Sequence, residues 1–156
     1  MNNTYKLYYE SPIGTLELKS NDDAVLSIMF EDRKETDHPE SVPQVLKACY
    51  EQIHEYFEGK RQEFTFPYML NGTPFQKTVW NALLNVPYSE TVSYQDIANA
   101  IKNEKAIRAV GNANGKNKLS IIIPCHRIIG SNGKLTGYAG GLWRKEWLLN
   151  HEKKLS

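Results

Sequence analysis

The chain has 156 residues, of which 40% are hydrophobic, 24% are charged and two are cysteines, and its formal net charge is +1. This length suits one domain of ordinary size or two small ones, and so few cysteines exclude a disulfide framework. The sequence shows no leader-like start, no apolar run of about 18 residues and no Cys/His cluster with zinc-ligand spacing. We therefore expect a cytoplasmic protein with no membrane partner, no structural metal and no cofactor.

The two halves of the chain differ in charge. Residues 1–69 contain 7 basic and 13 acidic side chains, a net charge of −6, whereas residues 70–156 contain 12 basic and 5 acidic side chains, a net charge of +7. A basic second half favours contact with a polyanion such as DNA. A chance distribution of charge over two solvated surfaces explains the counts equally well, so charge alone does not decide the function.

Residues 1–69 begin with three predicted strands, at 5–9, 15–18 and 24–30. Turn residues separate these stretches, which is typical of an antiparallel meander. The acidic stretch 31–40 has no apolar periodicity and is expected to be a loop.

A predicted helix follows, because apolar residues recur at helical spacing from Val42 to Phe57, with Gly59 as the stop signal. Cys49 lies on the apolar face of this helix, so we interpret it as a core residue. Residues 64–70 are expected to be extended and to lead into a linker near Asn71.

From Thr73 onward the sequence becomes helical. Thr73-Pro74-Phe75-Gln76 is a capping box with proline at the first helical position, and the helix it opens is predicted to stop before Pro87. A second short helix is predicted from Ser93 through Ile101. A third, capped by Asn103, is predicted from residue 104 or 105 until Asn114-Gly115 ends it.

The remaining residues complete a predicted winged-helix-like domain. Two short helices joined by a tight turn outline a helix-turn-helix. We expect a short strand at 120–123, a small hairpin at 128–135 about Asn132-Gly133 and a closing helix at 142–151. The predicted fold class is thus α/β, with a small α/β domain over residues 1–69 and a helical, winged-helix-like domain over residues 70–156.

The third of these helices has few long side chains. Ala106, Ala109 and Gly111 leave much of its surface bare, and Arg108 is the long side chain in its middle. A helix with ordinary side chains is about 10 to 12 Å across and the minor groove of B-DNA is about 6 Å wide, so a bare helix suits a protein that widens and enters this groove. Close packing of the helix against the core is the alternative, and Arg108 favours the DNA interpretation.

Cys125 is the candidate reactive atom, because it lies beside His126 and Arg127 in an apolar run. The thiolate is the nucleophilic form, and neighbouring positive charge or a base lowers the pKa of a cysteine. Adjacent residues of a strand point to opposite faces, so contact between Cys125 and His126 requires a bridging water or a turn at Pro124. An inert core cysteine is the alternative interpretation.

Several motifs occur in an order and spacing that identify a resemblance to the O6-alkylguanine-DNA alkyltransferases, also called methylated-DNA-protein-cysteine methyltransferases. The motifs are Ser93-Tyr94, Arg108 to Gly111, Pro124 to Arg127, Gly137 to Gly141 and Lys145 to Leu149. The resemblance covers residues 64–156, and the N-terminal part resembles the family's small RNase H-like α/β domain in outline.

The resemblance implies direct DNA repair without a cofactor. A monomer would bind duplex DNA, flip an O6-alkylguanine out of the stack and transfer the alkyl group irreversibly, in a single turnover, to its own Cys125. O4-alkylthymine is a second candidate substrate.

The resemblance also implies catalytic roles for individual residues. His126 would act as general base on Cys125 through a water, and Glu152 would orient the imidazole. Tyr94 would donate a proton to the guanine as it leaves, and Asn117 would brace the active-site turn.

Two further sets of residues follow from the resemblance. Arg108 would fill the place vacated by the flipped base. The residues implied in DNA binding are Tyr94, Ala106, Arg108, Ala109, Gly111 and Arg127. The residues implied in the alkyl pocket are Tyr138, Ala139, Gly140 and Gly141. Many family members carry serine where this chain has Ala139, so a hydroxyl that could donate to the guanine O6 is missing here.

Two other classes of function remain open at this point. One is a non-enzymatic winged-helix DNA-binding module or damage sensor, in which Cys125 is a core residue. The other is a Cys-His-Glu thiol hydrolase acting on small acyl substrates. Relatives that recognise lesions without repairing them carry tryptophan at the cysteine position, so Cys125 disfavours the sensor.

Overall fold

The computed structural model describes residues 3–31 and 41–154. The chain divides into two compact units, Met1–Leu70 (unit 1) and Asn71–Ser156 (unit 2). From residue 32 on, the loop expected at 31–40 lies outside the described residues. None of the described helices is long and apolar enough to cross a membrane.

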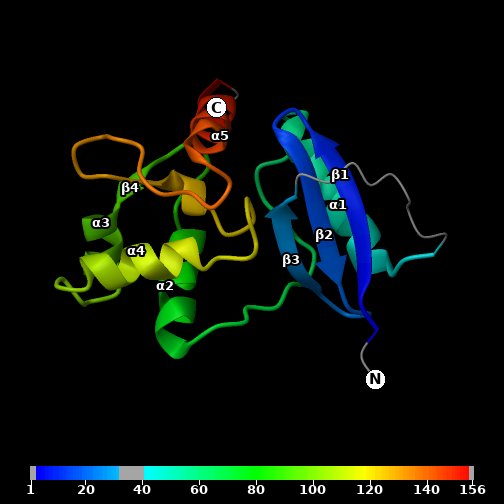
Figure 1. Cartoon of the computed structure of the whole chain (residues 1–156), viewed down its shortest axis with the longest axis horizontal. Helices are drawn as coiled ribbons and strands as arrows, with labels where there is room; N and C mark the ends of the chain where they lie inside the picture. The colour runs from blue at the N-terminus through cyan, green and yellow to red at the C-terminus, as the bar shows by residue number, and fades with distance from the viewer. Residues whose placement is uncertain (1–2, 32–40, 155–156) are drawn as a thin grey trace. The chain divides into compact units, whose positions relative to one another are not determined.

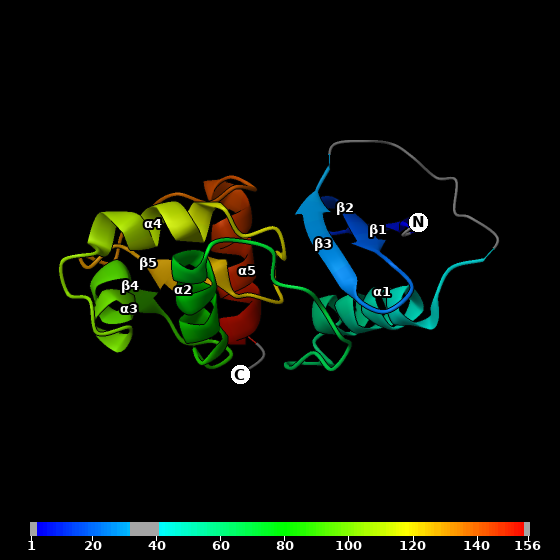
Figure 2. The same cartoon turned by 90° about the horizontal axis from the view of Figure 1, so that it is seen from below.

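Unit 1 is a three-stranded antiparallel sheet in the order β1-β2-β3, with α1 packed along one of its faces (Figures 1 and 2). The elements are β1 (Tyr5–Ser11), β2 (Gly14–Ser20), β3 (Val25–Phe30) and α1 (Gln44–Phe57). The pairs Leu7–Leu18 and Tyr9–Leu16 align buried side chains across β1 and β2. The predicted meander and helix are therefore confirmed, and Cys49 is fully buried on α1.

Residues 64–70 are less regular than predicted. Tyr68 makes a parallel bridge to Val25, whose N–H donates to the Pro67 carbonyl at 2.9 Å. The amide side chain of Gln52 on α1 satisfies the backbone of Thr65, whose N–H donates to Gln52 Oε1 at 2.9 Å. The Gln52 side chain thus supplies the hydrogen bonds that a neighbouring strand would otherwise supply. Residues 64–70 are therefore held in unit 1 without forming a regular strand.

Unit 2 is mainly helical, and α2, α3 and α4 pack against one another (Figure 2). Its short strands β4 and β5 form a parallel pair. The elements in chain order are α2 (Pro74–Leu84), β4 (Val92–Ser93), α3 (Tyr94–Ala100), α4 (Ile107–Gly115), the 3-10 turn η1 (Cys125–Arg127), β5 (Ile128–Ile129) and α5 (Leu142–Lys154).

The helix starts show where local sequence decides structure. The capping box at Thr73 is confirmed, since Gln76 N–H donates to Thr73 Oγ1 at 3.1 Å and Thr73 N–H donates to Gln76 Oε1 at 2.9 Å. The predicted cap at Asn103 is wrong. The helix α4 begins at Ile107 after Ala106, whose N–H donates to the Asn103 carbonyl at 3.0 Å, so Asn103 closes a turn before the helix.

Two predictions of extended structure in unit 2 are also wrong. Residues 120–123 form a turn in which Ile121 has a φ of +75° and Ile123 N–H donates to the Leu119 carbonyl at 3.0 Å. Residues 128–135 do not form a hairpin, because β5 pairs in parallel with β4, Ile128 opposite Val92. The turn about Asn132-Gly133 is present, since Gly130 N–H donates to the Lys134 carbonyl at 2.9 Å, but the residues on either side of it do not pair as strands.

Candidate active site

The turn η1 places Cys125 and His126 at the centre of unit 2. Pro124 precedes the turn, and its carbonyl accepts a hydrogen bond from Arg127 N–H at 2.9 Å. The turn at Pro124, which the sequence left as one way to bring the thiol and imidazole together, is present. The two side chains nevertheless have different hydrogen-bond partners. The Cys125 sulfur accepts from Asn117, and the His126 imidazole is hydrogen-bonded to Glu152.

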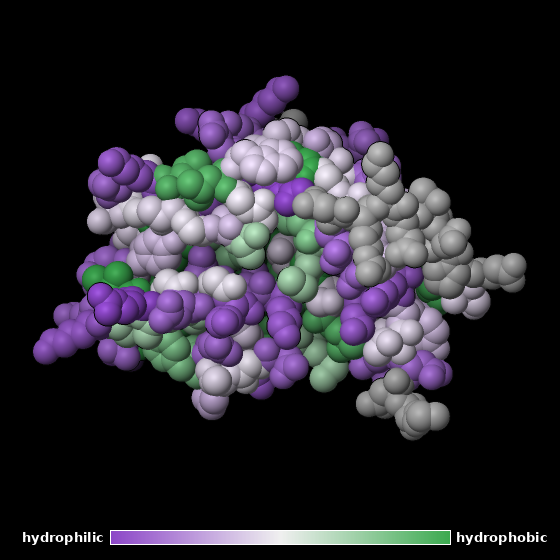
Figure 3. All heavy atoms as spheres, in the orientation of Figure 1, coloured by the Kyte–Doolittle hydropathy of each residue, from purple (hydrophilic) through white to green (hydrophobic). Residues whose placement is uncertain are grey.

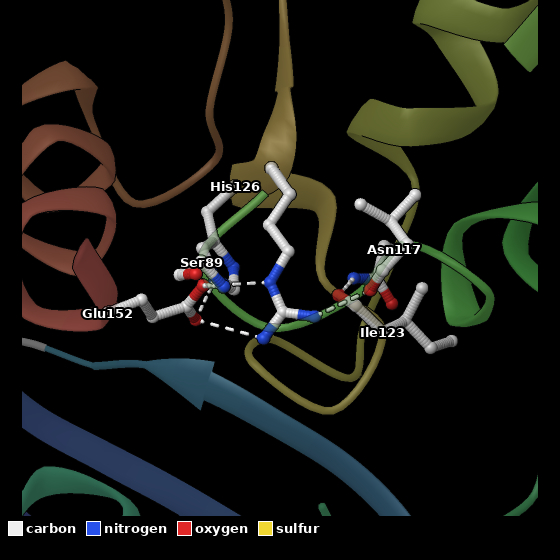
Figure 4. Close-up of polar contacts among 7 residues, drawn as sticks. Ser89, Asn117, Ile123, His126 and Glu152 are labelled. Carbon is white, nitrogen blue, oxygen red and sulfur yellow. Dashed lines mark hydrogen bonds and ion pairs between the residues drawn. The ribbon is translucent and has the colours of Figure 1, made fainter. Parts of the chain in front are cut away.

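Asn117 connects the sulfur to the backbone of the preceding turn. Its Nδ2 donates to the Ile123 carbonyl at 3.0 Å and to Cys125 Sγ at 3.3 Å, and its Oδ1 accepts from Leu119 N–H at 2.9 Å. Figure 4 shows Asn117 and Ile123 together in this turn. One buried amide therefore fixes the path of the chain into η1 and also the direction of the thiol.

The thiol is protonated at neutral pH. Cys125 is only 5% exposed, and burial raises its pKa, although the Asn117 hydrogen bond and the positive charge of Lys145 act in the opposite direction. Positive charge thus lowers the pKa of Cys125, as expected, but the charge belongs to Lys145 and burial outweighs it. A buried thiol of this kind needs a base before it can act as a nucleophile.

His126, Arg127 and Glu152 form a buried charged cluster. Glu152 Oε2 lies 2.6 Å from His126 Nε2, and Arg127 Nε donates to Glu152 Oε1 at 2.8 Å. The backbone N–H of Ser89 also donates to Glu152 Oε1, at 3.2 Å. Figure 4 shows Glu152 facing His126 and Ser89. The carboxylate thus holds the imidazole from the side away from Nδ1.

Burial keeps the pKa of the His126 imidazole below its usual value, which favours the neutral ring. Burial would raise the pKa of Glu152, but His126 and Arg127 together hold it well below its usual range. Burial lowers the pKa of His126, although Glu152 opposes the shift. Because Arg127 balances the carboxylate, His126 can donate from Nε2 and keep a lone pair on Nδ1, which is buried and has no hydrogen-bond partner among the described residues.

Arg127 is buried, whereas a residue that binds DNA must be exposed. Its side chain is buried against Glu152, its Nη1 donates to the Val86 carbonyl at 2.8 Å, and its guanidinium lies 5.6 Å from the centre of the Tyr88 ring. These contacts leave it unavailable to a phosphate. The prediction that Arg127 contacts DNA is wrong, because the guanidinium serves as the counter-charge of Glu152.

The surface of α4 is as bare as its sequence suggests. Arg108 and Ala109 are exposed, Ala106 and Gly111 are half-buried, and Val110 on the opposite side is fully buried. Nearby positions in the chain add further exposed cations, namely Lys102, Lys105, Lys116 and Lys118. On the face drawn in Figure 3, hydrophilic residues predominate and apolar residues form small separate patches.

Tyr94, the first residue of α3, reaches across to α4 and to the segment before α5. A Cβ added to Gly111 would lie 3.6 Å from the Tyr94 ring, so the small residue lets the ring lie close to α4. The Tyr94 hydroxyl lies 2.9 Å from Thr136 Oγ1. The phenol is therefore fixed between two segments of unit 2.

The segment 138–141 forms a tight turn in which Gly141 N–H donates to the Tyr138 carbonyl at 2.9 Å. The Tyr138 hydroxyl is buried, and this burial, followed by the nearby Cys125, raises its pKa well above the usual range. Ala139 is exposed, and the Gly140 carbonyl accepts from Arg144 Nη1 at 3.1 Å. The turn thus brings one aromatic side chain toward the thiol.

Lys145 is a site residue to which the sequence analysis gave no role. It is fully buried on α5, and its Nζ donates to the Thr136 carbonyl at 2.6 Å. Burial lowers the pKa of Lys145 to about 8, although the nearby Cys125 raises it. A sequence signal was present, because Lys145, Leu148 and Glu152 lie at positions i, i+3 and i+7 and so share one helix face.

The chemistry available at this site is that of a buried thiol with a neighbouring neutral base. Within the described residues, no group of three or more His, Cys, Asp or Glu side chains could hold a metal ion. The thiol of Cys125, the imidazole of His126 and the phenol of Tyr94 all belong to unit 2.

Family models match both units. Residues 4–70 match the ribonuclease-like domain of 6-O-methylguanine DNA methyltransferase, and residues 74–154 match the DNA binding domain of the same family.

Known proteins match over nearly the whole length. A methylated-DNA--protein-cysteine methyltransferase of Methanosarcina acetivorans is 44% identical over 152 residues, covering 95% of this chain and 97% of the relative. A constitutive protein of the same name from Bacillus subtilis is 42% identical over 152 residues, covering 92% of each chain. The crystal structure of Mycobacterium tuberculosis O6-methylguanine methyltransferase matches with a TM-score of 0.86 and 41% identity, over 99% of this chain and 95% of the other. A structure of the Mycobacterium tuberculosis protein in complex with DNA matches with the same TM-score and 42% identity, over 98% and 94% of the two chains.

Proposed function

This chain belongs to the 6-O-methylguanine DNA methyltransferase family, and on that premise we propose that it repairs duplex DNA by moving the methyl group of O6-methylguanine irreversibly to Cys125. The observation that carries the proposal is the arrangement around η1: a buried thiol held by Asn117 lies next in sequence to a neutral imidazole held by Glu152. This arrangement supplies a nucleophile and a base without a metal or cofactor.

The first step is activation of the thiol. His126 Nδ1 takes the proton of Cys125 through a bridging water, and the imidazolium that forms is stabilised by Glu152 at Nε2. Because burial, with a smaller contribution from Arg127, lowers the pKa of His126, the imidazole is neutral before the step and can accept this proton. Burial raises the pKa of Cys125, so the thiolate forms only when the base is aligned.

The second step is displacement at the methyl carbon. The Cys125 thiolate forms a bond to the methyl carbon as the bond from that carbon to guanine O6 breaks, and the electron pair passes into the guanine. Tyr94 donates its phenolic proton to a ring nitrogen, so that guanine leaves as a neutral base. The phenolate and the imidazolium then exchange a proton through solvent. The thioether cannot return to a thiol by this chemistry, which makes the reaction a single turnover.

A base inside the duplex cannot reach a buried thiol, so the nucleotide must be flipped out. The small side chains of α4 support entry of this helix into the minor groove, and the exposure of Arg108 supports its proposed role of occupying the space left by the base. The turn at 138–141 supplies the methyl pocket. Since one unit holds all of these groups, we propose that a monomer is the active form.

The test is the stoichiometry of a covalent adduct. After incubation with duplex DNA containing O6-methylguanine, mass spectrometry should show one methyl group per chain, on the peptide that contains Cys125. Duplex DNA containing unmodified guanine is the control. A DNA-binding module would bind the duplex and gain no methyl, and a thiol hydrolase would show no lasting adduct, so either result would overturn the proposal.

A further inference from the structure

We infer that Thr136 is a positioning residue of the transfer reaction: its hydroxyl directs the Tyr94 phenol and donates a hydrogen bond to the phenol oxygen as the phenol proton moves to the guanine. The inference rests on the proposed role of Tyr94 as proton donor. The distance between Tyr94 Oη and Thr136 Oγ1 is 2.9 Å, and either oxygen can be the donor.

Three separate segments fix the position of the Tyr94 ring. The backbone of Tyr94 is the first residue of α3, directly after the Ser93 cap, whose Oγ accepts from Asp96 N–H at 2.9 Å. The face of the ring lies near Gly111 of α4. The hydroxyl is held by Thr136, whose Oγ1 lies 2.9 Å from it and whose carbonyl oxygen lies 3.5 Å from it, so the shorter contact, to Oγ1, is the main influence on the direction in which the phenol proton points.

The backbone of Thr136 is itself held by a buried cation, Lys145. Lys145 Nζ donates to the Thr136 carbonyl at 2.6 Å and to the Gly137 carbonyl at 3.4 Å. Lys145 has no exposed surface, so the bond to the Thr136 carbonyl is shielded from water. The backbone of Thr136 is therefore held independently of its hydroxyl, which leaves the hydroxyl to act on Tyr94.

The space beside the phenol oxygen is left open by a glycine. Gly137 has a φ of +34°, and a Cβ built there would lie 4.0 Å from Tyr94 Oη, its nearest neighbour. Glycine thus puts no side-chain atom at this position beside the phenol oxygen.

The hydroxyl of Thr136 matches the charge changes of the proposed reaction. When Tyr94 donates its proton to the guanine ring, negative charge develops on Tyr94 Oη. The Thr136 hydroxyl can then rotate to donate to that oxygen, and a hydrogen bond to a charged acceptor is stronger than one to a neutral acceptor. The contact is therefore stronger in the transition state than in the resting protein, which is the condition for it to raise the rate.

Thr136→Val tests the inference, because it removes the hydroxyl but keeps the β-branched shape and the carbonyl that Lys145 binds. We expect the single-turnover rate at saturating protein, on duplex containing O6-methylguanine, to fall about threefold to tenfold, the range of one lost hydrogen bond. Thr136→Ser should restore most of the rate. Thr78→Val is the matched control, since the Thr78 hydroxyl donates within α2 to the Pro74 carbonyl, and it should keep the wild-type rate.

The decisive measurement is coupling to Tyr94. We take guanine N3 as the ring nitrogen that receives the Tyr94 proton. Duplex containing 3-deaza-O6-methylguanine has C–H in place of N3 and lacks this acceptor, so Thr136→Val should cause no further loss on this substrate. The double variant with Tyr94→Phe should be no slower than Tyr94→Phe alone.

Two results would overturn the inference, and they differ in what else they affect. Equal slowing of both substrates by Thr136→Val, or additive losses in the double variant, would make Thr136 a structural residue of the loop and leave the role of Tyr94 intact. A wild-type rate for Tyr94→Phe would remove the proton-donor role and this inference together, while methylation of Cys125 would still stand.

Discussion

The two cysteines of the chain are both buried, yet their surroundings differ. Cys49 has no exposed surface on α1 of unit 1, and burial raises its pKa to about 12. Cys125 is 5% exposed in unit 2, where the Asn117 hydrogen bond and the Lys145 charge oppose the effect of burial. Burial is therefore common to both thiols. What sets Cys125 apart from Cys49 is the polar groups within reach of its sulfur.

The same contrast holds for the ion pairs of the two units. Arg61 and Glu55 in unit 1 form a partly exposed pair at 3.1 Å, whereas Arg127 and Glu152 in unit 2 form a buried pair at 2.8 Å. An exposed pair contributes little to stability, while a buried charge that loses its partner is strongly destabilising. In unit 2, the ion pair whose loss should destabilise the fold is therefore the pair that also holds the His126 imidazole.

The largest effect should separate the two thiols. Cys125→Ser should abolish methyl transfer, because a neutral hydroxyl is a far weaker nucleophile than a thiolate, while DNA binding is largely kept. Cys49→Ser should retain transfer. The measurement is methyl uptake from labelled duplex, with binding followed by fluorescence anisotropy. Methyl uptake by Cys125→Ser near the wild-type rate would contradict the assignment of the acceptor.

The next effect separates the two ion pairs. Glu152→Gln leaves the Arg127 charge buried without its partner and should lower the free energy of unfolding by about 3 to 5 kcal/mol, whereas Glu55→Gln should lower it by about 1 kcal/mol or less. All the tryptophans, Trp80, Trp143 and Trp147, lie in unit 2, so their fluorescence in urea follows this unit. Circular dichroism can follow the Glu55 variant. Equal losses of unfolding free energy in the two variants would show that burial of the ion pair adds nothing to its contribution to stability.

A third effect concerns the exposed cations of the two units. Arg108→Ala should slow repair of duplex DNA about tenfold to a hundredfold and leave the reaction with free O6-benzylguanine nearly unchanged, because the free base has no stack to leave. Arg61→Ala in unit 1 is the control and should affect neither reaction. Single-turnover rates at saturating protein decide the matter. If Arg108→Ala repairs duplex DNA at the wild-type rate at saturating protein, Arg108 is an ordinary phosphate contact.

The smallest effect is a pH dependence specific to unit 2. Burial lowers the pKa of His126, so below pH about 6.5 the unfolded chain binds a proton that the folded chain does not, and stability falls as the pH falls. We expect the free energy of unfolding to drop as the pH falls from 7 to 5. Glu152, whose folded pKa is also lowered, adds to the loss below pH about 4.5. Tryptophan-detected urea unfolding at several pH values measures this, and His126→Gln should flatten the profile above pH 5.

Local signals in the sequence predicted much of the fold. The capping box at Thr73, the helix of Cys49 and the three strands of unit 1 depend on neighbouring residues, so their positions could be read directly. The strand predicted at 120–123 failed because hydrogen bonds from Asn117, two to six residues away, bend that segment into a turn, and the alternation of apolar residues does not reveal them. The parallel pair of β4 and β5 joins residues far apart in sequence, and its two-residue strands carry no periodicity.

The candidate site could be predicted in part. The motif of Cys125 and His126 was visible, but the roles of Asn117 and Glu152 came only from the family resemblance. Arg127 was misplaced because arginine is usually exposed, and nothing local indicates that Glu152 is its partner. Thr136 carries no motif, and its contact with Tyr94 depends on how the segment before α5 folds back.

The left-handed backbone of Ile121 places two opposing demands on that position. A non-glycine residue there costs about 1 to 2 kcal/mol, whereas burial of an isoleucine side chain, here 1% exposed, contributes about 1.5 to 3 kcal/mol. Glycine would relieve the backbone and leave a cavity, and asparagine would accept the backbone and bury an amide. Mutational tolerance at Ile121 should therefore be narrow, and a saturation library selected for repair should retain large aliphatic residues there against the usual preference of left-handed turns.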